Sequence, residues 1–246
     1  MRTQVMSYGG GVQTVAMVVA VLEGRIGKPD MIVAADTGRE RSTTWAYMNN
    51  VVNPALSVIG MTVEVAPHSL ATVDLYAHND DLLVPGFTGT GKLPTFCSDE
   101  WKQRPIMRYL RAAGVEQCDV WIGFSADEEQ RAKPAPTKWY QRRFPLLELG
   151  MNRADCRTII EDFGWPLQSK SACYMCPNMT DVEWVDVRDN SPEDFQKAIE
   201  LEQEIIEWDN VYLHSSCIPL AEVEFRPEST RVKQGHHQCS MGYCWV

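Results

Sequence analysis

Short apolar runs alternate with longer helical patterns along residues 1–125. The runs that predict strands are 3–7, 31–36, 61–66 and 119–125. Helices are predicted between them, at 12–23, 42–59 and 99–113. A bend is expected near Pro54, because proline lacks the N–H group that a helix interior needs. Strands alternating with helices predict an α/β fold with a parallel twisted sheet and helices on both faces.

The pattern changes after Pro145, where helices at 155–163 and 192–208 stand between irregular segments. We therefore expect a nucleotide-binding α/β domain over residues 1–145, and a helical, cysteine-bearing region over residues 146–246 packed on it. A chain of 246 residues, 44% of them apolar, suits this arrangement. No apolar run reaches the roughly 18 residues of a membrane span. The first residues also lack a signal-peptide pattern, so a cytoplasmic location without membrane contact is expected.

Three loops follow predicted strands and so should meet at the carboxyl edge of the sheet, where α/β folds bind ligands. They contain the sequences "YGGGVQT" (8–14), "DTGRE" (36–40) and "SADEEQR" (125–131). A glycine-rich turn before a helix lets backbone N–H groups approach an anion, and the helix dipole favours negative charge there. A tight turn that serves close packing alone explains the glycines equally well.

A net charge of −10 argues against broad electrostatic binding of nucleic acid. The segment 131–143 is a local exception, with five cations interleaved with Trp139 and Tyr140. We favour a solvated loop there over a surface for phosphate or RNA.

The motifs resemble those of the PP-loop ATP pyrophosphatase, or adenine nucleotide alpha hydrolase, superfamily. More narrowly, they resemble its phosphoadenylylsulfate (PAPS) reductase-like branch. Gly10 and Gly11 match the Ser-Gly-Gly-x-Asp-Ser loop, while Gln13 stands where that loop has aspartate. The segment "DTGRE" resembles the Asp-Thr-Gly-x-Glu motif, and "GFSADEEQR" and "FPLLELGMNRADC" resemble later ones. The resemblance implies an ATP (or PAPS/APS) site and Mg²⁺. The implied nucleotide-binding residues are Gly9, Gly10, Gly11, Val12, Gln13, Thr14, Asp36, Thr37 and Gly38, with Asp36, Lys102 and Arg131 as catalytic residues.

Eight cysteines without a secretory signal are unlikely disulfide partners. Cys118 and Cys156 fall in a predicted strand and helix, so we expect them to be buried. Cys173-x-x-Cys176 suits zinc, an iron–sulfur cluster or a redox dithiol. "FCSDEWKQRP" (96–105) resembles the cysteine segment of cluster-bearing adenylylsulfate (APS) reductases, which implies a [4Fe–4S] cluster. Its ligands would be Cys97, Cys173 and Cys176, with Cys239 or Cys244 or no fourth protein ligand. Zinc is the alternative, with His236 and His237 as optional ligands.

Three functions follow from these features. The first is an adenylating sulfurtransferase that activates a tRNA or DNA acceptor with ATP and then transfers sulfur. The second is a PAPS/APS reductase, although the tail "HQCSMGYCWV" lacks the Glu-Cys-Gly-x-His motif of thiol-dependent reductases. The third is a non-catalytic nucleotide- or cluster-binding module. A sulfur or electron donor protein is an expected partner, and an oligomer is compatible with all three.

Overall fold

A five-stranded sheet forms the centre of the molecule. The computed structural model describes residues 1–135 and 137–226. The strands, in the order β3-β2-β1-β6-β7, are all parallel. Their bounds are β1 Thr3–Ser7, β2 Met31–Ala35, β3 Val63–Ala66, β6 Cys118–Trp121 and β7 Tyr140–Arg143. The predicted α/β class with a parallel sheet is therefore confirmed. A separate hairpin pairs β4 (Phe87–Thr88) with β5 (Gly91–Lys92).

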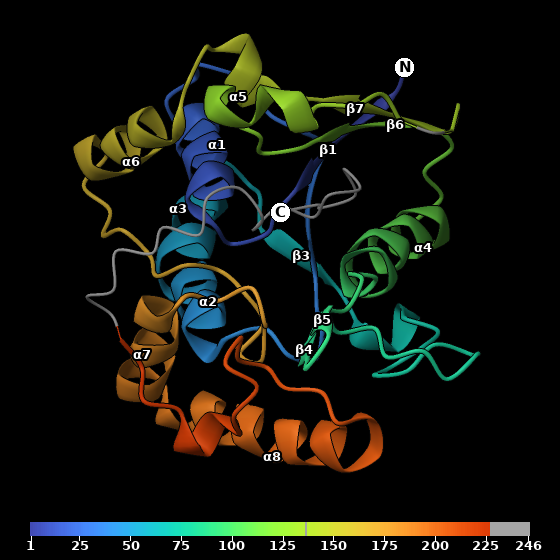
Figure 1. Cartoon of the computed structure of the whole chain (residues 1–246). Helices are drawn as coiled ribbons and strands as arrows, with labels where there is room; N and C mark the ends of the chain where they lie inside the picture. The colour runs from blue at the N-terminus through green and yellow to red at the C-terminus, as the bar shows by residue number, and fades with distance from the viewer. Residues whose placement is uncertain (136, 227–246) are drawn as a thin grey trace.

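Helices cover both faces of the sheet (Figure 1). On one face α1, α3 and α6 pack on side chains such as Met6, Ile32 and Trp121. On the other face α4 packs on Val5, Val33 and Val120. Neighbouring residues of one strand face opposite sides, which explains why Val5 and Met6 of β1, and Ile32 and Val33 of β2, belong to different apolar clusters. The helices are α1 Val12–Leu22, α2 Ser42–Tyr47, α3 Asn53–Val58, α4 Arg104–Ala112, α5 Pro145–Glu148, α6 Arg153–Asp162, α7 Asp181–Asn190 and α8 Pro192–Asp209.

Two helices contain a π-helical turn directly before a proline. One turn, Met48–Val52, joins α2 to α3, and the other, Asp99–Gln103, leads into α4. The prolines that follow are Pro54 and Pro105, each in the first turn of the next helix. The interruption predicted near Pro54 is thus present but begins upstream of it. A proline cannot donate to the carbonyl four residues earlier, and the wider turn accommodates that missing bond.

The edge strand β7 corrects the expectation of a solvated loop over residues 131–143. Tyr140–Arg143 pairs with β6 in parallel. Tyr140 is buried, and Trp139 is covered by Arg111, whose guanidinium carbon lies 4.8 Å from the ring centroid. The sequence did not predict β7, because Arg142 and Arg143 break the apolar pattern. An edge strand tolerates such residues, since it buries few of its side chains.

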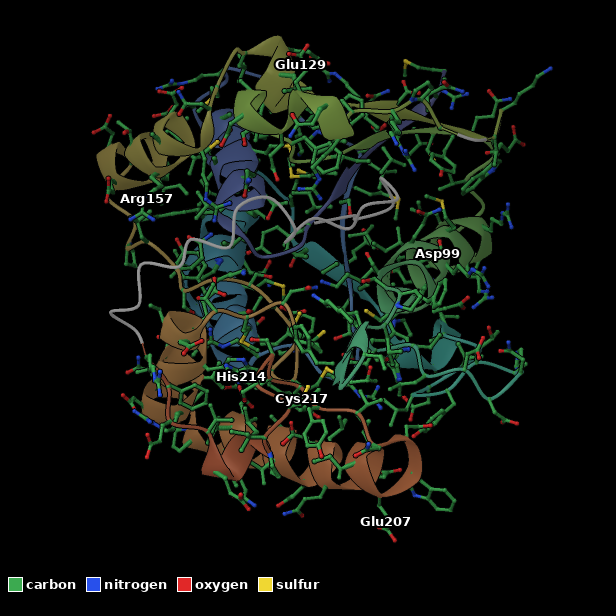
Figure 2. All side chains as sticks on the ribbon, viewed as in Figure 1. Asp99, Glu129, Arg157, Glu207, His214 and Cys217 are labelled. Carbon is green, nitrogen blue, oxygen red and sulfur yellow. The ribbon has the colours of Figure 1, made fainter. Side chains whose placement is uncertain are left out.

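A third apolar cluster lies beyond the sheet and packs α7 and α8 against the segment that precedes α4. It contains Leu83, Trp101, Met179, Trp184 and Ile205. Figure 2 shows His214 beside these helices, and Asp99 on the side of α4. His214 is buried, and its Nε2 lies 3.3 Å from Asp181 Oδ1 at the start of α7. The predicted helices at 155–163 and 192–208 correspond to α6 and α8.

The two regions expected on either side of residue 145 share a core. Ile159 and Ile160 of α6 belong to the same apolar cluster as Val15 and Val19 of α1. In the described residues, no helix is both long enough and apolar enough to span a lipid bilayer.

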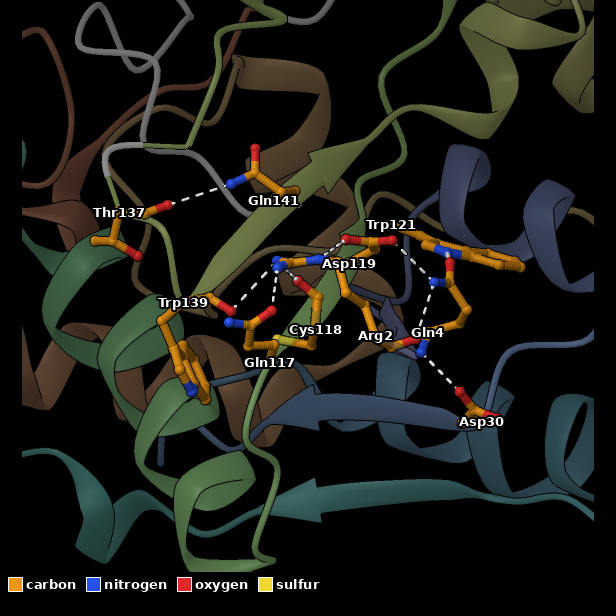
Figure 3. A network of polar contacts seen from close by, with 10 residues as sticks. All are labelled: Arg2, Gln4, Asp30, Gln117, Cys118, Asp119, Trp121, Thr137, Trp139 and Gln141. Carbon is orange, nitrogen blue, oxygen red and sulfur yellow. Dashed lines mark hydrogen bonds and ion pairs between the residues drawn. The ribbon is translucent and has the colours of Figure 1, made fainter.

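The amino edge of the sheet is closed by a polar network (Figure 3). Arg2 donates to Asp119 and to the carbonyl oxygens of Cys118 and Trp139. Gln4 Nε2 donates to the other oxygen of Asp119 at 2.9 Å. This network joins the beginnings of β1, β6 and β7 at the edge opposite the three loops.

Candidate functional site

The glycine turn at residues 9–11 leaves β1 at the carboxyl edge and begins α1 at Val12. No described residue accepts a hydrogen bond from the amides of Gly9, Gly10 or Gly11, whereas the Gly11 carbonyl accepts from Val15 N and Thr14 Oγ1. Free amides at a helix N-terminus are donors for an anion. The turn therefore has the groups that phosphate binding requires.

Gly10 is required at its position for two reasons. Its φ of +72° is a conformation that residues with a Cβ rarely adopt. A Cβ there would also lie 2.4 Å from Cγ2 of Thr44 on α2. Gly11 differs, because its φ is −83° and its nearest neighbour would be 3.9 Å from a Cβ. Close packing and anion binding are therefore not alternatives at this turn.

A pocket beside the glycine turn contains about 380 Å³ of empty space, part of which is open solvent. It lies at the ends of β1 and β2, with α2 and the start of α4 as its walls. Its apolar lining consists of Tyr8, Ala34, Ala35, Trp45, Met48 and Ile106. Its polar lining consists of Ser7, Gly9, Gly10, Glu40, Thr44 and Lys102. A pocket that is mostly apolar with a few convergent polar groups is typical of small-molecule sites.

Lys102 enters this pocket from the π-helical turn before α4, and Met48 from the π-helical turn after α2. The Lys102 ammonium lies 3.7 Å from Glu40 Oε2. Burial alone would lower the pKa of Lys102, but Glu40, Cys173, Cys176 and Cys97 together raise it above its usual range. Lys102 therefore stays charged, which suits it to an anionic ligand.

The cysteine loop and the "DTGRE" loop lie side by side. Glu40 and Cys173 form an antiparallel bridge, and Tyr174 N donates to Arg39 O at 2.8 Å. Thr37 Oγ1 lies 3.5 Å from Cys173 Sγ. Burial, followed by the charge of Glu40, raises the pKa of Cys173 to about 12. Of the predicted nucleotide-binding residues, Thr37 thus faces the cysteines.

Side chains of the segment 168–171 hold the carbonyl side of the glycine turn. Ser171 Oγ contacts Gly9 O and lies 3.1 Å from Glu40 Oε1. Gln168 Nε2 donates to Gly10 O at 3.4 Å. The cysteine loop and the glycine turn are therefore connected through one short segment.

The other predicted site residues lie outside the pocket lining. Asp36 Oδ1 accepts from Gly38 N at 2.7 Å, which forms a local turn. Gln13 Nε2 donates to Glu128 at 2.9 Å, and Glu128 also pairs with Arg131. The guanidinium of Arg131 covers the Phe124 ring, 4.5 Å from its centroid. The loop after β6 thus reaches α1 through Gln13, on a different side of the turn from Lys102.

The metal prediction concerns Cys97, Cys173, Cys176 and Cys239. The first three converge on Lys102, and their soft thiol donors suit iron–sulfur or zinc. Within residues 1–135 and 137–226, however, no three His, Cys, Asp or Glu side chains are placed so that they could hold a metal ion. Cys239, Cys244, His236 and His237 lie outside the described residues. The arrangement therefore does not fit a bound metal as it stands, and the ligand set remains a prediction.

Sequence reasoning missed several residues of the pocket. Tyr8 and Trp45 were not singled out, because an aromatic residue beside a glycine turn or in a helix usually belongs to the core. Glu40 was read only as part of a motif, and Ser171 carried no signal. A signal existed for Glu40, since a carboxylate directly after a strand–turn segment lies at the carboxyl edge.

Two solved structures are similar to this one. The first is a phosphoadenylyl-sulfate (PAPS) reductase from Candida auris in a phosphate complex, with 14% identity, a TM-score of 0.47, and coverage of 68% of this chain and 76% of the other. The second is the U34-tRNA thiolase NcsA from Methanococcus maripaludis with its [4Fe-4S] cluster, with 12% identity, a TM-score of 0.44, and coverage of 84% and 72%. No protein-family model and no curated protein matches the chain. Such TM-scores describe a general likeness of fold, and we transfer no residue role from either structure.

Proposed function

We propose that the protein is a PP-loop enzyme of the PAPS reductase-like type that adenylates an acceptor with ATP and then supports sulfur transfer to it. The observation that carries the proposal is the position of Lys102. It lines the pocket together with Gly9 and Gly10, and it lies among Cys97, Cys173 and Cys176. The Lys102 ammonium is therefore close both to the proposed anion-binding turn and to the three thiols.

In the proposed first step, a carbonyl oxygen of the acceptor attacks the α-phosphorus of ATP. The bond to the bridging oxygen breaks, pyrophosphate leaves, and the acceptor's N–H proton passes to solvent. The glycine-turn amides and Lys102 stabilise the charge that develops on the phosphate oxygens. Mg²⁺, with Asp36 as a proposed ligand, would neutralise pyrophosphate.

In the second step, hydrosulfide (HS⁻) attacks the activated carbon, the carbon–oxygen bond breaks, AMP leaves, and the S–H proton passes to solvent. The sulfur comes from a donor protein that delivers it to the cysteine loop. No step of this mechanism depends on a [4Fe–4S] cluster, because the described cysteines are not placed to hold one. The proposed acceptor is a tRNA or DNA component, since nucleobases carry the carbonyl oxygens that the first step requires.

Pyrophosphate release from γ-labelled ATP, together with AMP formation from α-labelled ATP, in the presence of Mg²⁺ and tRNA tests this function. We expect Lys102→Gln to lower the rate about 10²-fold, as loss of a group that stabilises transition-state charge does. Lys197→Gln is the matched control, since that side chain is 56% exposed. Sulfite release from PAPS, without use of ATP, would replace the proposal by sulfonucleotide reduction. If the protein bound nucleotide but catalysed neither reaction, the third function, a non-catalytic nucleotide-binding module, would replace the proposal.

The metal prediction has a separate test. Protein purified without oxygen is expected to be brown if a cluster is bound and colourless if zinc is bound, with iron, sulfide and zinc measured by elemental analysis. Cys173→Ser and Cys176→Ser should each lose the metal, whereas Cys118→Ser should retain it, because Cys118 is fully buried in the sheet. If the wild-type protein contained neither iron nor zinc, the proposed metal ligands would be contradicted.

A further inference from the structure

We propose that the Tyr8 hydroxyl hydrogen-bonds the edge of a nucleobase bound in the pocket, and that Tyr8 is therefore a specificity-determining residue for the base. This inference rests on the proposed function, because it takes the nucleotide as the occupant of the pocket.

The first observation is an unsatisfied polar group. Tyr8 is 3% exposed and lines the pocket beside the glycine turn. Its hydroxyl has no hydrogen-bond partner among the described residues. Buried polar groups nearly always have a partner, and leaving one unpaired costs free energy. A ligand in the pocket would supply the missing partner.

The second observation is the chemistry of the surrounding wall. Ala34, Trp45, Met48 and Ile106 give the pocket an apolar lining that suits the faces of an aromatic ring. Lys102 and the glycine turn line the same pocket and offer positive charge and free amides. The combination matches a ring with a polar edge joined to an anionic group, which describes a nucleotide. An aliphatic ligand would leave the hydroxyl unpaired.

The protonation state of Tyr8 agrees with this role. Burial, and to a lesser extent Tyr47, raises the pKa of Tyr8 above its usual range. The hydroxyl therefore remains neutral at physiological pH and can both donate and accept. It can pair with a ring nitrogen or with an exocyclic amino group.

The proposal predicts two effects of opposite sign for Tyr8→Phe. Without nucleotide, the variant should be as stable as the wild type or more stable, because an unpaired buried hydroxyl is removed. With ATP, its Kd should rise about tenfold, because the base edge then lacks its partner. A purely structural tyrosine would not show this combination.

The experiment measures thermal unfolding without nucleotide and ATP affinity by calorimetry, on the full chain. Tyr47→Phe is the matched control, because the Tyr47 hydroxyl donates to Pro166 O at 2.8 Å. That variant should lose stability and bind ATP as the wild type does.

The outcomes separate the two levels of the proposal. If the wild type binds ATP and Tyr8→Phe binds it equally well, the role of Tyr8 is refuted and the proposed function stands. A lower Tm for unliganded Tyr8→Phe would also overturn the inference, because it would show that the hydroxyl already has a partner. If the wild type binds no adenine nucleotide, the proposed function fails, and this inference fails with it.

Discussion

Individual side chains and glycines define the site more sharply than the motif that contains them. In the run of three glycines, Gly10 carries both a positive φ and a close contact with Thr44, while Gly11 carries neither. Lys102 and Glu40 form a nearly buried pair, with side chains 15% and 6% exposed. The composition of the turn was visible in the sequence, but the separate role of each glycine was not.

The two glycines should respond differently to alanine. We expect Gly10→Ala to lose about 1–2 kcal/mol or more of stability, the usual cost of a left-handed conformation, to which the clash with Thr44 adds. Gly11→Ala should be neutral or gain up to about 1 kcal/mol, because alanine restricts the unfolded chain. Urea unfolding of both variants measures this difference. Equal losses for the two would contradict the described geometry of the turn.

At the scale of elements, the cysteine loop depends on a short segment for its position. Ser171 and Gln168 bind the glycine carbonyls, and Arg41 N donates to Ala172 O at 3.3 Å. The side chain of Arg41 is 1% exposed and pairs with Asp186 of α7 at 2.7 Å. These contacts fix the segment between the glycine turn and α7, so local opening of this segment is expected to increase the reactivity of the half-buried cysteines.

Ser171→Ala should expose the cysteine loop. Loss of about 1–1.5 kcal/mol of hydrogen bonding would raise the opened population roughly tenfold. Metal-free protein treated with iodoacetamide and analysed by peptide mass spectrometry should show Cys173 and Cys176 reacting faster by that factor. The control is Ser169→Ala, because Ser169 is exposed and donates to Thr43 Oγ1, at 3.3 Å, rather than to the glycine turn. Buried Cys156 provides the internal reference, and equal rates in the two variants would refute the coupling.

At the scale of the whole molecule, the two edges of the sheet contain different groups of residues. The carboxyl edge carries the pocket, and the amino edge carries the network of Arg2, Gln4 and Asp119 (Figure 3). Burial alone would raise the pKa of Asp119, but hydrogen bonds from Gln4 and Arg2 and the charges of Arg2 and Arg143 lower it overall. The folded state therefore favours the ionised carboxylate.

This shift predicts how stability depends on pH. A carboxyl group whose pKa is lowered by folding stabilises the protein above its unfolded pKa, and this contribution is lost as the pH falls through the folded value. Asp119→Asn should cost about 1–3 kcal/mol near pH 7, the range for hydrogen bonds to a charged group. The difference from the wild type should shrink below about pH 4, where the unfolded carboxyl is protonated. Denaturant unfolding at several pH values measures it, and a constant difference would contradict this account.

Some helices and strands could be predicted from the sequence, and others could not. The runs at β1, β2 and β6 were readable because strands covered on both faces are mostly apolar, and β3 was readable because its residues alternate. The expected boundary near residue 145 remains a prediction, and α6 packs on α1 across it. The strand β7 was missed because an edge position tolerates charge, and the π-helical turns were missed because no residue type marks them.

The sequence alone determined the alternation of strands and helices, the glycine turn and the identity of the thiol and cationic groups, because these follow from local spacing and side-chain chemistry. Only the tertiary structure decided that Lys102 lies in the pocket with Gly10, that Arg131 pairs with Glu128, and that the Tyr8 hydroxyl lacks a partner. These are contacts between residues far apart along the chain. They depend on how the helices pack on the sheet, and no local pattern encodes that.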